Sequence, residues 1–249
     1  MFSPRVAVAS LSGESDADWA KRAADHVGCA FLGGIALDAE TRTAAREMVR
    51  RDRNEFLPRD PIAFVDEQLS LLEGVPVQPA FNVRTSTIGP LRDAAAVCAE
   101  HGAFLEINAH CRQAEMCAVG AGESLLRDDE RLAEQVAAAS DAGATVSVKV
   151  RAELPGVDLP TVTDRVLEAG ATIIHVDAMD SEPIVAELPD AAFLVANNGV
   201  RDRETVEEYL EHGADAVSVG RPSDTPVVLR RVRAAVEEWF AETEASADA

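Results

Sequence analysis

The chain has 249 residues, with 23 lysines and arginines against 44 aspartates and glutamates, so its formal net charge is −21. Hydrophobic residues make up 47% of it, which is enough for a packed core and excludes a wholly disordered chain. No apolar run approaches the ~20 residues that cross a bilayer, and the first residues lack the pattern of a secretory signal. We therefore expect a cytoplasmic protein with no membrane partner.

The basic residues are almost all arginines. Only two lysines occur, Lys21 and Lys149. An acidic, lysine-poor chain suits a cytoplasm of very high salt, because screening removes the repulsion between its carboxylates. The composition predicts a halophilic protein; an ordinary acidic protein from an arginine-rich genome is the alternative. In molar salt the negative charge does not exclude a nucleic-acid partner.

Four cysteines, Cys29, Cys98, Cys111 and Cys117, are spread through the chain without a Cys-x-x-Cys pair. A disulfide framework is not expected in a long cytoplasmic chain. We expect no metal site; the alternative is a zinc site built from His110, Cys111 and Cys117.

A local pattern recurs along the chain: a charged helical stretch ends in glycine, and an apolar run of strand length follows. Eight strands are predicted, at Val6–Ser10, Ala30–Gly33, Val75–Phe81, Phe104–Asn108, Thr145–Val150, Thr172–Val176, Phe193–Ala196 and Ala216–Val219. The helical stretches between and after them are Ala17–Val27, Pro61–Leu72, Leu91–His101, Asp129–Ala142, Leu159–Ala169, Arg203–His212 and Pro226–Glu242, and the segment Glu182–Leu188 precedes the seventh strand. Continuous apolar strands that alternate with helices indicate a parallel sheet covered on both faces.

Eight such units predict an α/β fold, a single-domain TIM (β/α)8 barrel over residues 1–240. The rival, an open doubly wound sheet, would more often carry Gly-x-Gly-x-x-Gly after its first strand, and none occurs here. A helical segment is inserted around residues 38–60, with a helix at Ala39–Arg51. This segment is rich in arginine and is a candidate lid or RNA contact. The acidic tail, 241–249, is expected to be flexible.

In such barrels the active site lies at the carboxyl ends of the strands. Lys149 draws attention there, because one of only two lysines stands inside an apolar strand and an unpaired buried ammonium costs several kcal/mol. The alternative is a lysine whose head group reaches the rim. His175 ends the sixth predicted strand beside Asp177, and it is either a ligand-binding imidazole or a packing residue.

Two glycine-containing segments follow the last two strands. Asn198 and Gly199 follow the seventh, and Gly220 and Arg221 follow the eighth. Barrels often bind a phosphate at this place, with backbone N–H groups and a helix N-terminus, and Arg221 could clamp it. Ordinary turn chemistry is the alternative for the Asn-Gly pair. Cys111, just after the fourth strand, is either a reactive thiol or a small packing residue.

Three motifs in chain order resemble those of the tRNA-dihydrouridine synthases, which carry an Asn-x-Gly-Cys-Pro loop, a Gly-x-Gly-x-x-Leu-Leu segment and Val-Lys-x-Arg. The matching residues are Glu106-Ile107-Asn108-Ala109-His110-Cys111, Gly120-Ala121-Gly122-Glu123-Ser124-Leu125-Leu126-Arg127 and Val148-Lys149-Val150-Arg151. Further matches, from Val77-Gln78 through Ile174-His175-Val176 and Asn198-Gly199-Val200 to Gly220-Arg221, extend the resemblance over residues 70–235.

The resemblance implies an FMN-dependent oxidoreductase that reduces the C5–C6 double bond of a uracil ring in tRNA, with NADPH as electron donor. It implies that Cys111 is the general acid and that Asn108 and Arg151 bind the substrate. It also implies a set of residues around the flavin and its phosphate: Gln78, Lys149, His175, Asn198, Gly199, Gly220 and Arg221. A lysine ammonium beside the flavin would stabilise the reduced, anionic form.

The match departs from the family in four places. Ala9-Ser10-Leu11 replaces an N-terminal Ala-Pro-Met, His110-Cys111-Arg112 replaces Gly-Cys-Pro, and His175-Val176-Asp177 replaces His-x-Arg. No helical tRNA-binding domain is expected after Arg221. The resemblance is therefore to a shortened, archaeal-type relative. Three alternatives stay open: a dihydroorotate- or dihydropyrimidine-dehydrogenase-like flavin enzyme on a free pyrimidine, a flavin-free barrel that binds a sugar phosphate with Lys149 as a Schiff base, and a degenerate barrel that only binds a partner.

Overall fold

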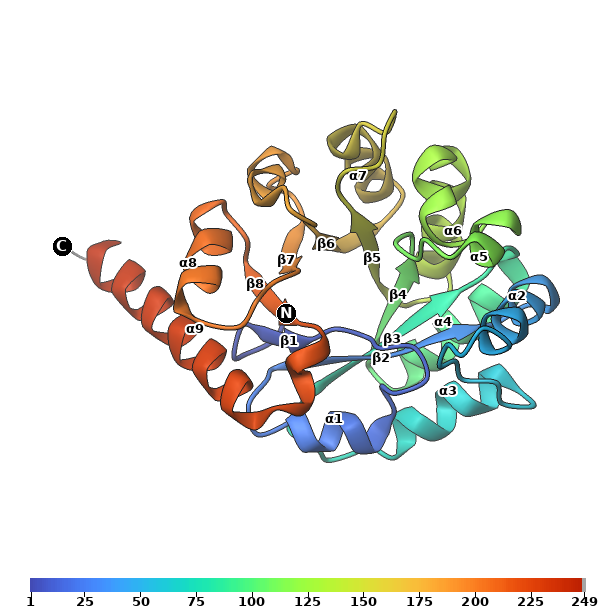
Figure 1. Cartoon of the computed structure of the whole chain (residues 1–249), viewed down its shortest axis with the longest axis horizontal. Helices are drawn as coiled ribbons and strands as arrows, with labels where there is room; N and C mark the ends of the chain where they lie inside the picture. The colour runs from blue at the N-terminus through green and yellow to red at the C-terminus, as the bar shows by residue number, and fades with distance from the viewer. Residues whose placement is uncertain (248–249) are drawn as a thin grey trace.

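The computed structural model describes residues 1–247, and in it eight parallel strands close into a barrel in the order β1 to β8 (Figure 1). The strands are β1 (Val6–Val8), β2 (Cys29–Ala36), β3 (Gln78–Arg84), β4 (Phe104–Asn108), β5 (Thr145–Arg151), β6 (Ala171–Asp177), β7 (Phe193–Asn197) and β8 (Ala216–Val219). β8 pairs with β1 and completes the ring. The prediction of a single-domain TIM barrel is confirmed.

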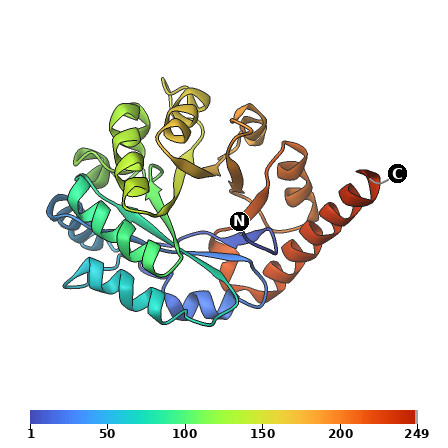
Figure 2. The same ribbon diagram turned by 180° about the vertical axis from the view of Figure 1, so that it is seen from behind.

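Helices surround the barrel and are visible from both sides (Figure 2). The α-helices are α1 (Ala17–Ala23), α2 (Ala39–Val49), α3 (Pro61–Ser70), α4 (Ile88–Glu100), α5 (Ala114–Ala118), α6 (Asp129–Asp141), α7 (Leu159–Glu168), α8 (Arg203–Glu211) and α9 (Pro226–Ala247), and three short 3-10 helices are η1 (Gly122–Arg127), η2 (Glu182–Glu187) and η3 (Arg221–Asp224). Aspartates begin several of them: Asp16, Asp38 and Asp60 each accept a hydrogen bond from a backbone N–H of the first turn. None of the described helices is long and apolar enough to cross a membrane.

The interior of the barrel changes character along its axis. Near the amino ends of the strands it is filled by apolar side chains, among them Phe31, Phe104 and Ile173. Near the carboxyl ends the inward positions are polar and still buried, as at Glu106 and His175, which have no exposed surface. Because side chains alternate along a strand, Phe104, Glu106 and Asn108 of β4 all point inward while Leu105 and Ile107 pack against the helices. The sequence thus places its polar atoms at one end of the barrel.

The predicted third strand is wrong by three residues. The prediction was Val75–Phe81, whereas β3 begins at Gln78 and ends at Arg84. Val75 and Val77 belong to a turn in which the N–H of Val77 donates to the carbonyl of Val75. β2 is longer than predicted and continues to pair with β3 beyond an irregularity at Gly33, up to Ala36 and Arg84.

Other predictions of local structure also differ from the structure. The first strand and the first helix are shorter than predicted and end at Val8 and Ala23. The inserted helix ends at Val49, slightly earlier than Arg51. The tail expected to be flexible from residue 241 is helical as far as Ala247, because α9 continues without a break; the last two residues lie outside the described part of the chain.

Candidate functional site

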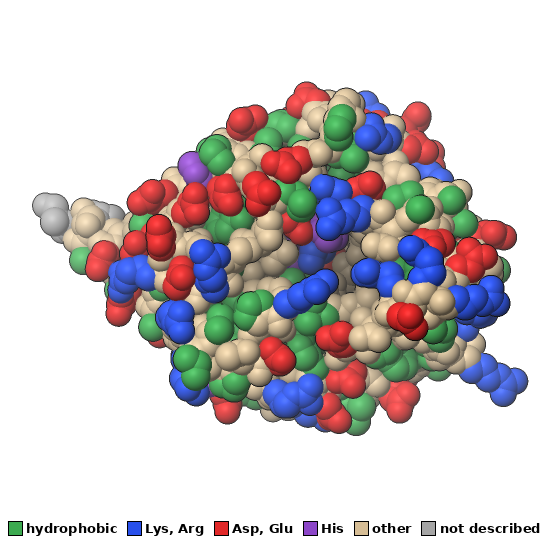
Figure 3. Space-filling view, in the orientation of Figure 1, with side chains coloured by type: hydrophobic (Ala, Val, Ile, Leu, Met, Phe, Trp, Pro, Cys, Tyr) green, Lys and Arg blue, Asp and Glu red, His purple; other side chains and the backbone are tan. Residues whose placement is uncertain are grey.

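A cavity of about 540 Å³ opens at the carboxyl ends of the strands. Figure 3 shows it as a hollow near the centre of the view, with Lys and Arg side chains around it. Segments after β1, β2, β4 and β8 contribute to its wall, together with one residue of β5. The lining residues are Ser10, Leu11, Ser12, Glu14, Met48, Asp52, Arg53, Asn54, Glu55, Asn108, His110, Cys111, Arg112, Gln113, Lys149 and Arg221.

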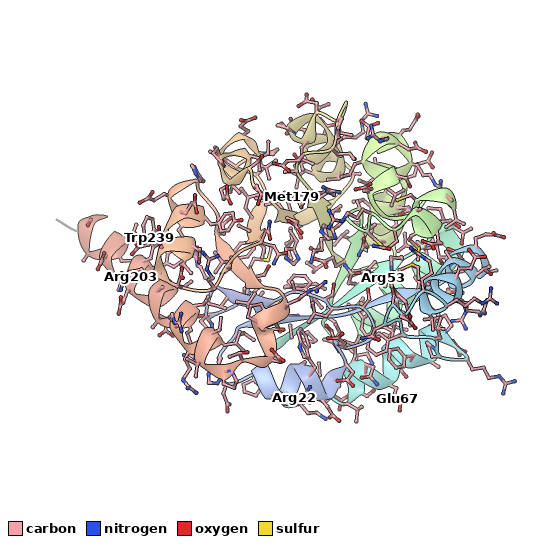
Figure 4. The ribbon with its side chains drawn as sticks, in the orientation of Figure 1. Arg22, Arg53, Glu67, Met179, Arg203 and Trp239 are labelled. Atoms are coloured by element: carbon pink, nitrogen blue, oxygen red, sulfur yellow. The ribbon has the colours of Figure 1, made fainter. Side chains whose placement is uncertain are left out.

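The cavity is lined by four cationic side chains that are free of protein partners. Lys149, Arg53, Arg112 and Arg221 make no side-chain hydrogen bond or ion pair within residues 1–247, although the chain has 44 carboxylates. Arg53 comes from the segment after α2, and Figure 4 labels it on a different side of the barrel from Met179, which follows β6. A cationic hollow in a strongly acidic molecule selects an anionic ligand.

Three acidic residues also line the cavity. Glu55 is neutralised by Arg84, since the two form an ion pair in which each side chain is 1% exposed. Glu14 accepts a hydrogen bond of 2.8 Å from the side chain of Asn54. Asp52 is exposed to solvent. The four free cations therefore face only two carboxylates whose charge is not already balanced.

Beneath the cavity, a chain of buried hydrogen bonds crosses the barrel. The Asn108 amide donates to Asn82 at 2.9 Å, and the Asn82 amide donates to Glu106 Oε1 at 2.7 Å. Glu106 Oε2 lies 2.7 Å from His175 Nδ1, and His175 Nε2 lies 2.8 Å from Ser218 Oγ. The network ties β3, β4, β6 and β8 together with fully buried atoms, so its geometry is rigid.

The charge states of this network follow from its partners. Burial raises the pKa of Glu106, but the neighbouring His175 and Lys149 and the hydrogen bonds from His175 and Asn82 outweigh it, so the pKa lies below its usual range. Burial lowers the pKa of His175, in spite of the Glu106 carboxylate. Glu106 is therefore ionised and His175 neutral at pH 7. The Nδ1 proton points to Glu106, and Nε2 accepts from the Ser218 hydroxyl.

Lys149 stands between this network and the cavity. Its side chain is buried, and its ammonium affects the pKa of Glu106, His175, His110 and Asp177, which places all four close to it. Glu106 is the buried counter-charge that makes a cation tolerable at this depth. The ammonium has no hydrogen-bond acceptor of its own in the described residues, so its donors remain available to a ligand in the cavity.

The loop after β4 is held by Asn108. Its side-chain oxygen accepts from the backbone N–H of His110 at 3.2 Å and of Cys111 at 2.8 Å. His110 Nε2 lies 2.7 Å from Asp177 Oδ2, which joins this loop to the end of β6. The thiol of Cys111 lies at the cavity wall. By accepting these two hydrogen bonds, Asn108 helps to fix the backbone conformation of the loop after β4.

The segments after β7 and β8 are shaped for close approach to the backbone. Asn198 and Gly199 both have positive φ, 103° and 66°. The Asn198 amide donates to the Met179 carbonyl at 2.5 Å, and the Tyr209 hydroxyl donates to the Asn198 carbonyl at 2.9 Å, so side chains fix this turn. Gly220 precedes η3, and a side chain at Gly220 would meet no atom within 4 Å. Open space beside Gly220 and Arg221 is available to a ligand.

Of the residues singled out from the sequence, Asn108, Cys111, Lys149 and Arg221 line the cavity. His175 is buried within the barrel, and Asn198, Gly199 and Gly220 follow β7 and β8 at the same end of the barrel but do not line the cavity. Two further residues lie elsewhere. Gln78 is the first residue of β3, at the amino end of the barrel, where it donates to the Gly102 carbonyl at 2.8 Å. Gln78 therefore lies at the opposite end of the barrel from Lys149. The predicted third strand, which began three residues too early, had placed it further along the strand. Arg151 lies at the correct end, but it pairs with Glu123 at 2.6 Å and lines a neighbouring hollow of about 450 Å³.

Sequence reasoning missed several residues of the site. The sequence indicated Arg53 only as part of the arginine-rich segment and did not indicate Arg112, because nothing in an exposed arginine shows that it faces a cavity. Glu106 and Asn82 were seen only as polar strand residues. One signal could have indicated Glu106. It is a carboxylate inside a buried strand, and the next strand along the chain carries a buried lysine. The described residues hold no group of three or more His, Cys, Asp or Glu side chains suited to a metal ion.

The fold and the cavity define a TIM barrel with a cationic mouth. No family model matches the chain. An uncharacterized protein of Methanocaldococcus jannaschii is 27% identical over 230 residues, which are 87% of this chain and 88% of that protein. The indole-3-glycerol phosphate synthase of Streptomyces griseus is 36% identical over 127 residues, 44% of this chain and 46% of the synthase.

Two solved structures extend the comparison. Thiamine phosphate pyrophosphorylase from Pyrococcus furiosus superimposes with a TM-score of 0.54 at 10% identity, covering 94% of this chain and 96% of that one. A chain of the tryptophan synthase complex from Pyrococcus furiosus superimposes with a TM-score of 0.55 at 14% identity, covering 96% and 97%. At these identities the likeness establishes the barrel fold alone.

These findings overturn the resemblance to the tRNA-dihydrouridine synthases. The similar proteins that have names are an indole-3-glycerol phosphate synthase, a thiamine phosphate pyrophosphorylase and a tryptophan synthase. They support an enzyme, but not a flavoprotein oxidoreductase that makes dihydrouridine. The placement of Gln78 at the far end of the barrel agrees with this correction. Binding of FMN, NADPH, tRNA or a free pyrimidine stays a prediction of that resemblance alone.

Proposed function

We propose that this chain is a flavin-free enzyme that acts on a small phosphorylated carbonyl compound, with Lys149 as the amine that forms a Schiff base with it. The observation that carries the proposal is the environment of Lys149. It is buried, it has no protein partner within residues 1–247, and it lines a cavity with three unpaired arginines. A chain that uses arginine for nearly every cation has kept a primary amine at this one buried position.

The phosphate end of the substrate would lie against the segments after β7 and β8. Phosphate is commonly bound at this position in TIM barrels, by backbone N–H groups and a short helix N-terminus. Here the positive-φ turn at Asn198 and Gly199, the open space at Gly220 and the unpaired guanidinium of Arg221 support such a role. An arginine can bind a phosphate with two parallel hydrogen bonds.

The carbonyl end would reach Lys149. For a Schiff base, the ammonium must first lose a proton; the neutral amine then adds to the carbonyl carbon, and the oxygen leaves as water. Glu106 balances the ammonium in the resting state. The proton that Lys149 releases would pass to solvent in the cavity that it lines. A protonated Schiff base would restore one positive charge for Glu106 to balance.

The presence of only two lysines makes the proposal easy to test. The protein would be incubated with pyridoxal phosphate, a phosphorylated aldehyde, then reduced with borohydride and mapped by peptide mass spectrometry. We expect the adduct at Lys149, and not at Lys21, which is exposed on α1 and serves as an internal control. Inorganic phosphate should compete, and pyridoxal without its phosphate should label far less.

Two variants complete the experiment. Lys149→Arg keeps the positive charge and should abolish the adduct, whereas Lys21→Arg should leave it unchanged. Equal labelling of the two lysines, or labelling by pyridoxal that matches labelling by pyridoxal phosphate, would contradict the proposal. Stoichiometric flavin in the purified protein would contradict it as well.

A further inference from the structure

The cationic residues of the cavity lie on two sides of the barrel. Arg221 follows β8, and Arg112 follows β4. In a closed ring of eight strands, β4 and β8 are four strands apart in either direction, which makes them opposite each other. Both arginines line the same cavity, so they face each other across the mouth.

Arg53 belongs to the side of Arg112. The segment that carries it is tied to α5, which follows β4, by an ion pair of 2.6 Å between Arg51 and Glu115. The Arg53 guanidinium also helps to lower the pKa of Glu115, after the backbone hydrogen bond and Arg51, which places it near the loop after β4. One side of the mouth thus has two free guanidinium groups, and the other has one beside an open glycine turn.

The segment that carries Arg53 is anchored, which makes it a wall of the cavity. Glu55, two residues later, is held by the buried guanidinium of Arg84, and Phe56 forms a parallel bridge with Ile35 of β2. A side chain at Gly13 would lie 2.6 Å from the backbone nitrogen of Glu55, so the segment also packs tightly against the loop after β1. These contacts fix the position of Arg53 relative to the barrel.

We infer that the mouth takes a substrate with two anionic groups, one held by Arg221 with the turns after β7 and β8 and the other by Arg53 and Arg112, with Lys149 between them. The inference rests on the proposed function for the role of Lys149 and adds to it the second anion. A substrate with a single phosphate would leave one side of the mouth with uncompensated positive charge, since Glu55 is paired with Arg84 and only Glu14 and Asp52 remain to balance four cations. The chemical class is a bisphosphate, or a phosphate that carries a carboxylate at its far end.

Linear alkanediphosphonates of increasing length test the inference, with alkylmonophosphonates of the same length as reference. They contain no carbonyl, so they bind without reacting with Lys149. In titration calorimetry in molar KCl, we expect one length of diphosphonate to bind at least about tenfold more tightly than the matching monophosphonate, because each charge-assisted hydrogen bond contributes about 1.5 kcal/mol or more. Absence of a preferred length, or equal affinity of the two series, would overturn the inference.

Variants then assign the two sides. Arg53→Gln combined with Arg112→Gln should remove the advantage of the diphosphonate and change monophosphonate binding little. Arg50→Gln is the matched control, because Arg50 is an exposed arginine of the same segment that does not line the cavity. If the control removes the advantage equally, the effect is one of bulk charge and the inference is wrong.

The outcomes separate this inference from the proposed function. Preference for diphosphonates without an adduct at Lys149 would overturn the Schiff base and leave the two-anion site. An adduct at Lys149 with no preference for diphosphonates would overturn the two-anion site alone. If neither series binds and phosphate does not compete with pyridoxal phosphate, both are wrong.

Discussion

His175 Nδ1 lies 2.7 Å from Glu106 Oε2, and neither side chain is exposed to solvent. This contact decides the electrostatics of the barrel interior. It fixes the imidazole tautomer, it keeps Glu106 ionised, and Glu106 in turn balances the buried ammonium of Lys149. The polar end of the barrel is thus built around one carboxylate.

Replacement of Glu106 should therefore be costly to the fold. Glu106→Gln removes the counter-charge of Lys149 and replaces one of two acceptor oxygens by an NH2 group, which would face either the Asn82 amide or the His175 N–H. We therefore expect the free energy of unfolding to fall by about 3 kcal/mol. Ser147→Ala is the matched control, because its hydroxyl donates to the same carboxylate at 3.2 Å and its loss should cost only about 1 kcal/mol. Denaturant titration in molar KCl measures both. A Glu106→Gln protein as stable as the Ser147→Ala protein would show that Glu106 is not the counter-charge.

The same pair predicts how stability depends on pH. The pKa of His175 is lowered from its ordinary 6.5, so below pH 6.5 the unfolded chain binds a proton that the folded chain refuses, and stability falls as the pH falls. His110, whose pKa is also lowered, adds to this loss. The pKa of Glu106 is lowered from 4.5, so its contribution, complete above pH 4.5, is lost at more acid pH.

Denaturant titrations between neutral pH and about pH 5 measure the first part of this dependence, because carboxylates still contribute little there. His175→Gln should make the loss of stability below pH 6.5 smaller than in the parent protein, leaving the share that belongs to His110. An unchanged dependence in the variant would mean that His175 takes up its proton equally well in the folded barrel, against the burial seen here.

The sequence was sufficient for the architecture because the barrel repeats one simple pattern. Apolar strands, helices and glycine after a helix recur through the chain, and each repeat reinforces the others. The bounds of β3 were predicted wrongly, because they depend on pairing with β2 and not on the apolar residues of the segment itself. Val75 and Val77 are apolar but lie in a turn, whereas Asn82 and Arg84 are polar but lie in the strand.

The site was only partly predictable, and for two physical reasons. A glycine turn followed by an arginine suits a phosphate in whatever molecule carries it, so these motifs could not separate a flavin from another phosphorylated ligand. Arg53 and Arg112 belong to segments that are far apart in the chain, and only the closed barrel brings both residues to one cavity. Lys149 was visible from the sequence because a lysine in an apolar strand contradicts its surroundings.

Gly122 holds the loop of Cys111 in place, and a pair of glycine substitutions tests this. Gly122 has a φ of 66°, and a side chain there would lie 2.2 Å from the Cys111 carbonyl oxygen, so Gly122→Ala should destabilise the protein by about 1–3 kcal/mol. Gly89, in α4, would meet no atom within 4 Å, and Gly89→Ala should stabilise by about 0.5 kcal/mol. Thermal unfolding of both variants checks the signs; equal effects would mean that the loop adapts to the added methyl group.

Salt should control the stability of the whole molecule. With 44 acidic and 23 basic side chains, removal of salt lengthens the range of repulsion among surface carboxylates, so dialysis into dilute buffer should unfold the protein. On α8, the exposed Glu204, Glu208 and Glu211 repel one another at helical spacing and have no ion pair within residues 1–247. Replacing these three residues by glutamine changes the net charge from −21 to −18 and should lower the KCl concentration at half-unfolding. Circular dichroism against KCl concentration measures this midpoint, and a parent protein that stays folded without salt would refute the halophilic interpretation.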